Sequence, residues 1–180
     1  MEAMGKVANY VGYHGTSVES ARRILVEGFR QKSVGYHHWL GDGFYFFESS
    51  ASWARWWIDM RYAGSGVVLR AEISVERHAV LDLLDYDDMR RFQEYRTRVI
   101  RELRKRRKRV WKQRPWDGYV INMLCIHGGI RVVRAAFPEP EEHVDDTVRR
   151  NESRIRRIHI QLCCRDPHCI TSVSLAHTGA

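Results

Sequence analysis

Two short motifs near the start of the chain carry side chains suited to binding and chemistry. The first is His14-Gly15-Thr16, at the end of an apolar segment, and the second is Gly43 to Phe47 with Tyr45 at its centre. If the two segments are strands lying side by side, an imidazole, a hydroxyl, a phenol ring and a close-approach glycine come together. Such a set of groups could hold a flat aromatic cation beside a ribose.

Two common nucleotide-binding loops are absent from the sequence. Neither the Gly-x-Gly-x-x-Gly turn between a strand and a helix nor a phosphate loop ending in Gly-Lys-Ser/Thr is present. A dinucleotide site in this chain would therefore be built differently from those two designs.

Capping signals predict two helices beside the motifs. Thr16-Ser17-Val18-Glu19 has the form of a capping box, and Gly28 suits the left-handed end of a helix of about three turns. Ser49 or Ser50 can cap a second helix. An apolar stripe at helical spacing follows in that helix, and most of its rings are expected to pack in the core. The stripe consists of Trp53, Trp56, Trp57 and Met60.

The remaining pattern favours a strand-rich chain. Asp85 opens a long helix that runs to about residue 112 before Pro115 stops it. Two apolar runs joined by His127-Gly128-Gly129 predict a hairpin. The expected strands cover residues 10–13, 43–47, 67–75, 78–84, 119–126, 130–137, 155–164 and 170–175. Strands outnumber helices, so the predicted class is α+β, in a single domain over residues 1–180.

The charge distribution suggests a polyanionic partner. The formal net charge is +8 with a pI near 9.6, and a basic helix at about 85–114 concentrates cations in its second half. Nucleic acid is the partner such a cluster would contact through its phosphates. An acidic loop at about 138–152 could shield the helix. The candidate nucleic-acid-binding residues are Arg104, Lys105, Arg106, Arg107, Lys108 and Arg109.

Cysteine usage and hydropathy indicate a soluble cytoplasmic protein without a metal. No window approaches the roughly 18 to 20 apolar residues of a membrane span, and the first residues have no apolar signal segment. The four cysteines lack Cys-x-x-Cys spacing and are read as reduced core thiols. A zinc site matches no common tetrahedral spacing. Its ligands would be His159, Cys163, His168 and Cys169.

Taken with their spacing, the motifs resemble the poly(ADP-ribose) polymerase-like branch of ADP-ribosyltransferases. That family places a Gly-x-Tyr-Phe strand after a His-Gly-Ser/Thr strand, and a second aromatic eleven residues after the tyrosine, which is Trp56 here. The resemblance covers residues from about 10 to 60 and from about 155 to 175. It implies split antiparallel sheets with flanking helices, and NAD as the substrate.

The resemblance also implies roles for individual residues. His14 would bind ribose hydroxyls, Gly15 would hold the nicotinamide carboxamide through its backbone, and Thr16 would contact the adenosine side. Tyr45 and Trp56 would enclose the nicotinamide, where cation–π attraction contributes roughly 0.5 to 2 kcal/mol. Gly43 completes the implied cofactor-binding set.

The third catalytic position departs from the family pattern. Where the polymerases have glutamate at the head of a late strand, this chain has Gln161. Glutamine can hydrogen-bond the nicotinamide ribose, but it brings no charge to stabilise the oxocarbenium-like cation. Transfer of a single ADP-ribose is therefore expected rather than chain elongation.

The motifs and the charge are compatible with several functions. The charge favours a nucleic-acid acceptor, RNA or DNA, and a small transferase of this kind resembles a bacterial toxin or phage-defence effector restrained by an acidic antitoxin or immunity protein. The acceptor could instead be a protein or water, the latter giving an NAD glycohydrolase. A binding module for NAD or nucleic acid that has lost catalysis is a further alternative. RNA 2′-phosphotransferase activity is less favoured, because that chemistry requires several arginines around the site and because the aromatic transferase pattern fits better at Tyr45.

Overall fold

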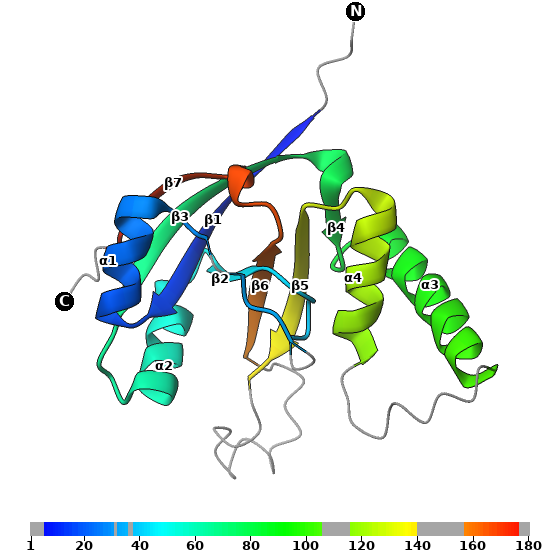
Figure 1. Cartoon of the computed structure of the whole chain (residues 1–180), viewed down its shortest axis with the longest axis horizontal. Coiled ribbons are helices and arrows are strands. Elements are labelled where there is room, and N and C mark those ends of the chain that lie inside the picture. The colour runs from blue at the N-terminus through cyan, green and yellow to red at the C-terminus, as the bar shows by residue number, and fades with distance from the viewer. Residues whose placement is uncertain (1–5, 31, 36–37, 106–115, 140–156, 177–180) are drawn as a thin grey trace, which may run out of the picture.

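The computed structural model describes residues 6–30, 32–35, 38–105, 116–139 and 157–176. These residues form an α+β fold, with one seven-stranded sheet and four α-helices (Figure 1). The strand order is β4-β5-β6-β2-β1-β3-β7. The strands are β1 (Val7–Thr16), β2 (Phe44–Glu48), β3 (Val67–Glu76), β4 (Val80–Asp82), β5 (Val132–Pro138), β6 (Ile158–Cys164) and β7 (Ile170–Leu175).

All neighbouring strands are antiparallel except β4 and β5. Between those two the chain forms helices α3 (Tyr86–Lys105) and α4 (Trp116–Gly128). Two parallel strands cannot be joined by a tight turn and require a crossover connection, which these helices supply. The parallel pair thus follows from the helical segment between the strands.

Helix α4 corrects the predicted hairpin. Residues 119–126 are helical, and only the second apolar run, now β5, is a strand. The buried positions of α4 are Val120, Ile121, Leu124 and Cys125, which recur at helical spacing. A short run that is apolar on every side cannot be assigned to helix or strand by periodicity alone. Gly129, at φ +65°, supplies the left-handed turn that ends the helix.

The two helices near the motifs begin at serines. Ser17, not Thr16, caps α1 (Val18–Glu27), and its hydroxyl accepts the Ser20 N–H at 3.2 Å. Thr16 remains the last residue of β1, and the third residue after the Ser17 cap is Ser20 rather than Glu19, so the helix is capped without the predicted capping box. Ser50 caps α2 (Ala51–Tyr62). Gly28 ends α1 as predicted, but its φ of 74° and ψ of -176° lie outside the left-handed helical region that the prediction specified.

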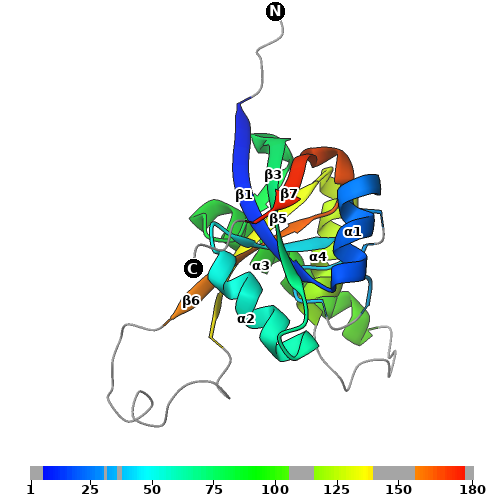
Figure 2. The same ribbon diagram turned by 90° about the vertical axis from the view of Figure 1, so that its left-hand side faces the viewer.

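Helices cover both faces of the sheet. On one face, Ile24 of α1 packs against a cluster that includes Phe44, Phe46 and Ile73. On the other face α2 packs through Ala54 and Ile58, which are 0% exposed, and α3 and α4 cover the β4–β6 end. Helices α1 and α2 therefore lie on opposite sides of β1 and β3 (Figure 2).

The sheet opens between β1 and β2. The β1–β3 ladder runs from Val7 to Thr16, whereas the β1–β2 register contains only the pairs Gly12–Glu48 and Tyr13–Phe47. Beyond Tyr13 the two strands diverge. The described strands thus form one continuous sheet with a short seam between β1 and β2, rather than the predicted split sheets.

The basic helix is described only in part. Helix α3 ends at Lys105, so Arg106 to Arg109 and the rest of the predicted helix lie outside the described residues, as does the acidic loop from residue 140 onward. No helix in the described part of the chain is long and apolar enough to cross a membrane.

Candidate functional site

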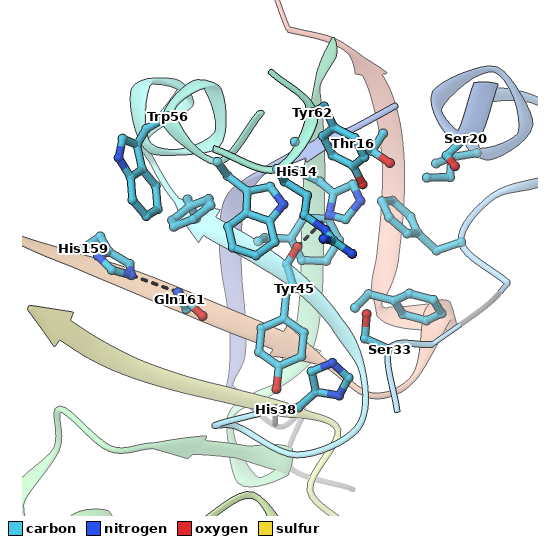
Figure 3. Close-up of a pocket in the computed structure, with 18 of the residues that line it drawn as sticks. His14, Thr16, Ser20, Ser33, His38, Tyr45, Trp56, Tyr62, His159 and Gln161 are labelled. Atoms are coloured by element: carbon cyan, nitrogen blue, oxygen red, sulfur yellow. Dashed lines mark hydrogen bonds between the residues drawn. The ribbon is translucent and has the colours of Figure 1, made fainter. Parts of the chain in front are cut away.

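A cleft of about 1130 Å³ lies at the opening between β1 and β2. It collects most of the predicted binding residues from separate elements (Figure 3). The predicted residues that line it are His14, Gly15, Thr16, Tyr45, Trp56 and Gln161. The structure thus brings both early motifs and the late strand to one cavity.

The cleft begins where a backbone pair is missing. Hydrogen-bonded pairs recur at every second residue of an antiparallel ladder, and the Ser49 N–H donates to the Val11 carbonyl at 2.8 Å. Continuing that register would pair Gly15 with Tyr45. Instead the Tyr45 carbonyl accepts a hydrogen bond from Nδ1 of His14 at 2.8 Å. The backbone N–H of Gly15 consequently faces the opening between the strands.

His14 is held as a neutral imidazole. Burial lowers its pKa from the ordinary value of 6.5, and the hydrogen bond to the Tyr45 carbonyl opposes that shift only in part. Because a carbonyl can only accept, Nδ1 carries the proton and Nε2 keeps its lone pair. The ring also packs against Phe29 and Phe46, with centroids 5.3 and 5.8 Å away. His14 therefore offers a fixed acceptor suited to a sugar hydroxyl.

The Tyr45 ring is anchored at its far end. Its hydroxyl donates to the Gly41 carbonyl at 2.6 Å and accepts the Leu40 N–H at 3.1 Å. Burial is the main cause of a strongly raised pKa, so the phenol stays protonated. The ring centroid of His38 lies 5.7 Å away. Tyr45 is thus a rigid wall of the cleft rather than an acid or base.

The loop that anchors Tyr45 is clamped to α4 and to the end of β6. The Oδ1 atom of Asn122 accepts hydrogen bonds from the Asp42 N–H at 2.9 Å and from Arg165 at 2.7 Å. Gly118 lies so close to the His38 carbonyl that a Cβ atom there would overlap it. Helix α4 therefore supports the site without lining it.

Gly43 has a different place from the one predicted. It is not among the residues that line the cleft, and a Cβ atom at this position would lie 2.5 Å from Sγ of Cys163 and 2.8 Å from the Cys164 carbonyl. The missing side chain allows β2 to approach β6 closely. Gly43 thus acts on the site through the placement of Tyr45.

The tryptophan stripe of α2 belongs to the core only in part: Trp53 packs against the buried cluster of Phe47 and Ile58, as expected, but the other members of the stripe do not. Trp57 is 42% exposed and Met60 50% exposed, while Ala54 and Ile58 form the buried side of the helix. Trp56 and Trp57 instead line the cleft. The Trp56 ring lies toward the His159 side of the cavity and the Tyr45 ring toward the His38 side (Figure 3).

Gln161 lies on the same face of the sheet as Tyr45. It pairs with Phe47 in the β2–β6 register, and Tyr45 pairs with Cys163 two residues along. Directly opposite residues of an antiparallel pair share a face, so the side chains of Gln161 and Tyr45 project from neighbouring strands to the same side. The side-chain amide nitrogen of Gln161 lies 2.9 Å from Nε2 of His159.

Other cleft residues were not predicted from the sequence. His159 lies two positions before Gln161 on the same strand, and the period of two could have indicated it. His38 gave no signal in a polar loop. Three arginines also line the cleft, one from α1, one from the following loop and one from α2, and they are Arg23, Arg30 and Arg61.

The basic end of α3 is separate from the cleft. Arg104 and Lys105 lie in its last turn, and no α3 residue lines the cavity. In Figure 1, α4 lies between α3 and β5, on the side away from α1 and α2. Any nucleic acid bound along α3 would therefore contact the protein beyond the cleft itself.

We expect the protein to lose stability as the pH falls below 6.5. Burial lowers the pKa of both His14 and His159 from that value, so the unfolded chain binds more protons between 6.5 and the folded pKa values. Stability then rises with pH across this window and is fully present above it. Thermal melts from pH 7.5 to 5 should show a falling melting temperature, and a shallower fall in His159→Phe. A flat profile would contradict this expectation.

One curated protein resembles this chain over most of its length. The chain is 28% identical over 178 residues to the uncharacterized protein MJ0359 of Methanocaldococcus jannaschii. The alignment covers 88% of this chain and 83% of that protein. No family model matches the chain, and no solved structure gives a significant match.

Proposed function

We propose that the protein is an NAD-dependent mono-ADP-ribosyltransferase. The observation that carries the proposal is the interrupted pairing of β1 and β2. There Nδ1 of His14 donates a hydrogen bond to the Tyr45 carbonyl, and the backbone N–H of Gly15 faces the cleft. A carboxamide needs a backbone donor of that kind, and a ribose hydroxyl needs an acceptor such as Nε2 of His14. The carboxamide and the ribose of nicotinamide riboside would thus both find a hydrogen-bond partner in the same opening.

The reaction breaks the bond between the ribose C1′ and the nicotinamide nitrogen. The electron pair of that bond goes to the leaving nicotinamide, and an acceptor oxygen or nitrogen bonds to C1′ and loses its proton. The cation that develops at C1′ is stabilised by oriented dipoles. Gln161, projecting beside Tyr45, offers an amide for this purpose, and its lack of charge favours one transfer over polymer growth.

The arginines of the cleft suit the diphosphate of NAD. Arg30 is paired with Glu27 at 3.6 Å, an exposed pair of little energetic weight. Arg23 donates only a long 3.4 Å hydrogen bond to Ser20 among the described residues. Guanidinium groups bind phosphate oxygens through paired donors. Phosphates bound here would place the adenosine end of NAD near the start of α1, next to Thr16 at the end of β1.

A nucleic-acid acceptor is the favoured target. The net charge of +8 and the exposed Arg104 and Lys105 provide phosphate contacts beyond the cleft. A role as a toxin or defence effector, with an acidic protein as its restraint, is the biological setting that we propose for such an activity. Transfer to protein, hydrolysis of NAD and binding without turnover are the alternatives that the experiment below separates.

A second candidate is RNA 2′-phosphotransferase activity, which also consumes NAD. The sequence alone disfavoured it for want of arginines around the site, and the structure brings Arg23, Arg30 and Arg61 to the cleft. That observation restores it as an alternative. An RNA bearing an internal 2′-phosphate, incubated with the protein and NAD, would lose the phosphate only if this candidate is correct.

Labelling identifies the acceptor. The protein is incubated with NAD labelled on the adenine and with total nucleic acid or protein extract, and the products are digested separately with ribonuclease, deoxyribonuclease and protease. Macromolecular label that nuclease removes and protease does not is the expected result. Label released only by protease would move the acceptor to protein. Free ADP-ribose alone would indicate a glycohydrolase, and NAD binding without nicotinamide release would indicate a binding module.

A further inference from the structure

The amide of Gln161 can face the cleft in two ways. Its oxygen accepts hydrogen bonds and carries partial negative charge, whereas its nitrogen donates and carries partial positive charge. A carboxylate at this position would have no such ambiguity. Only the orientation with the oxygen toward the ligand can accept from a ribose hydroxyl or stabilise a developing cation, so the role of Gln161 depends on what fixes its amide.

His159 is placed to fix it. The two residues are separated by one position on β6 and share a face, and Nε2 of His159 lies 2.9 Å from Nε2 of Gln161. Because the amide nitrogen can only donate, the imidazole nitrogen must accept. Figure 3 shows the Gln161 oxygen on the side of the amide away from His159. The contact therefore leaves that oxygen free to meet a ligand.

Packing holds the imidazole in place. His159 is 6% exposed, and its ring lies 4.7 Å from Trp53, 5.3 Å from Phe47 and 6.0 Å from Phe137, measured between centroids. Aromatic rings from three elements thus restrict its rotation. Burial also lowers its pKa, which keeps the ring neutral and able to accept at neutral pH.

The other ring nitrogen points to a functional reason for this arrangement. When Nε2 accepts, Nδ1 carries the proton, and Nδ1 has no hydrogen-bond partner among the described residues. A buried donor without a partner costs about 1 to 3 kcal/mol. If His159 only filled the core, an apolar ring would fill the same space without leaving a buried donor unpaired. A role in orienting the Gln161 amide explains why a histidine stands there.

We propose that His159 is a positioning residue that holds the Gln161 amide with its oxygen toward the cleft. The proposal rests on the proposed ADP-ribosyltransferase function. In the opposite orientation the amide NH₂ would face the cation that forms as nicotinamide leaves, and the same side chain would then oppose the reaction. The pair would thus replace, by an oriented dipole, the single carboxylate of the enzymes that the motifs resemble.

Two substitutions of His159 test the contact. His159→Phe keeps an aromatic ring among the neighbouring rings and removes the acceptor, whereas His159→Gln places a side-chain oxygen near the position of Nε2. We expect His159→Phe to lower kcat for nicotinamide release by at least about 10-fold with KM for NAD changed less than about threefold. His159→Gln should remain within about threefold of the wild type. Equal turnover in His159→Phe and the wild type would overturn the proposal.

A double-mutant cycle separates positioning from direct contact with the ligand. If His159 acts through Gln161, adding His159→Phe to Gln161→Leu should cost no further activity, because the oriented group is already gone. Additive losses would assign His159 a role of its own and overturn the proposal. Circular dichroism and thermal melts of each variant verify folding.

A measurement on the unliganded wild type completes the test. Nitrogen-15 NMR should show His159 with a protonated Nδ1 and an unprotonated Nε2, and the reverse tautomer would overturn the proposal even if a variant failed to fold. The failure of the proposed function has a different signature. A wild-type protein that neither binds nor consumes NAD would exclude the transferase, whereas an active wild type with an equally active His159→Phe variant would exclude only the positioning role.

Discussion

Replacing His14 with asparagine should abolish NAD consumption and leave the fold intact. The asparagine amide can still donate to the Tyr45 carbonyl, as Nδ1 of His14 does at 2.8 Å. It has no group in the place of Nε2, so the acceptor for the ribose hydroxyl is lost. Loss of one oriented hydrogen bond to a reacting sugar typically costs about 100- to 1000-fold in rate. We therefore expect nicotinamide release to fall by at least about 100-fold, measured by chromatography under saturating NAD.

His14→Phe provides the matched control. Phenylalanine fits the aromatic surroundings of Phe29 and Phe46 but leaves the Tyr45 carbonyl without its donor. It should be inactive and less stable by about 1 to 3 kcal/mol. His14→Asn, in contrast, should melt close to the wild type. An asparagine variant that turns over NAD within threefold of the wild type would remove His14 from the site.

Arg134→Met should cause the largest loss of stability. Arg134 on β5 pairs with Glu48 of β2 at 2.7 Å and with Asp82 of β4 at 3.1 Å, and the three side chains are 19%, 15% and 16% exposed. Removing the guanidinium leaves two poorly solvated carboxylates without a counter-charge. Breaking a buried ion pair in this way costs about 3 to 5 kcal/mol. Urea unfolding should show this loss in the free energy of unfolding.

A variant without the carboxylates isolates the charge effect. Combining Arg134→Met with Glu48→Gln and Asp82→Asn removes the uncompensated charges and should restore more than half of the lost free energy of unfolding. If the triple variant is as unstable as Arg134→Met, packing rather than charge holds these strands. This cluster lies outside the cleft lining, so NAD turnover of any folded variant should be retained.

Local signals predicted the elements around the early motifs and failed in the middle of the chain. Gly28 and Ser50 mark helix ends that the structure contains, since caps depend on nearby backbone alone. The prediction that residues 119–126 form a strand was wrong, because they belong to helix α4. Its partners are distant in sequence, and an all-apolar run becomes helix or strand according to what surrounds it. The parallel β4–β5 pair depends on that same helix.

The site was predictable to the extent that it is built from motifs. His14, Tyr45 and Gln161 line one cleft, yet the hydrogen bond between His14 and the Tyr45 carbonyl depends on where two strands part, which no local pattern encodes. Arg61 reaches the cleft from the far end of α2. Such convergence arises from tertiary packing and has no signature in sequence spacing.

The ends of β5 and β6 meet beside the cleft, where the Glu139 N–H donates to the Arg157 carbonyl at 3.1 Å. Glu139 and His159 both belong to the cleft wall. The chain therefore leaves β5 and enters β6 at two points that are hydrogen-bonded to each other beside the cleft. Because this hydrogen bond fixes the spacing of the two strand ends, a segment exchanged between homologues would be joined at the same two points beside the cleft wall.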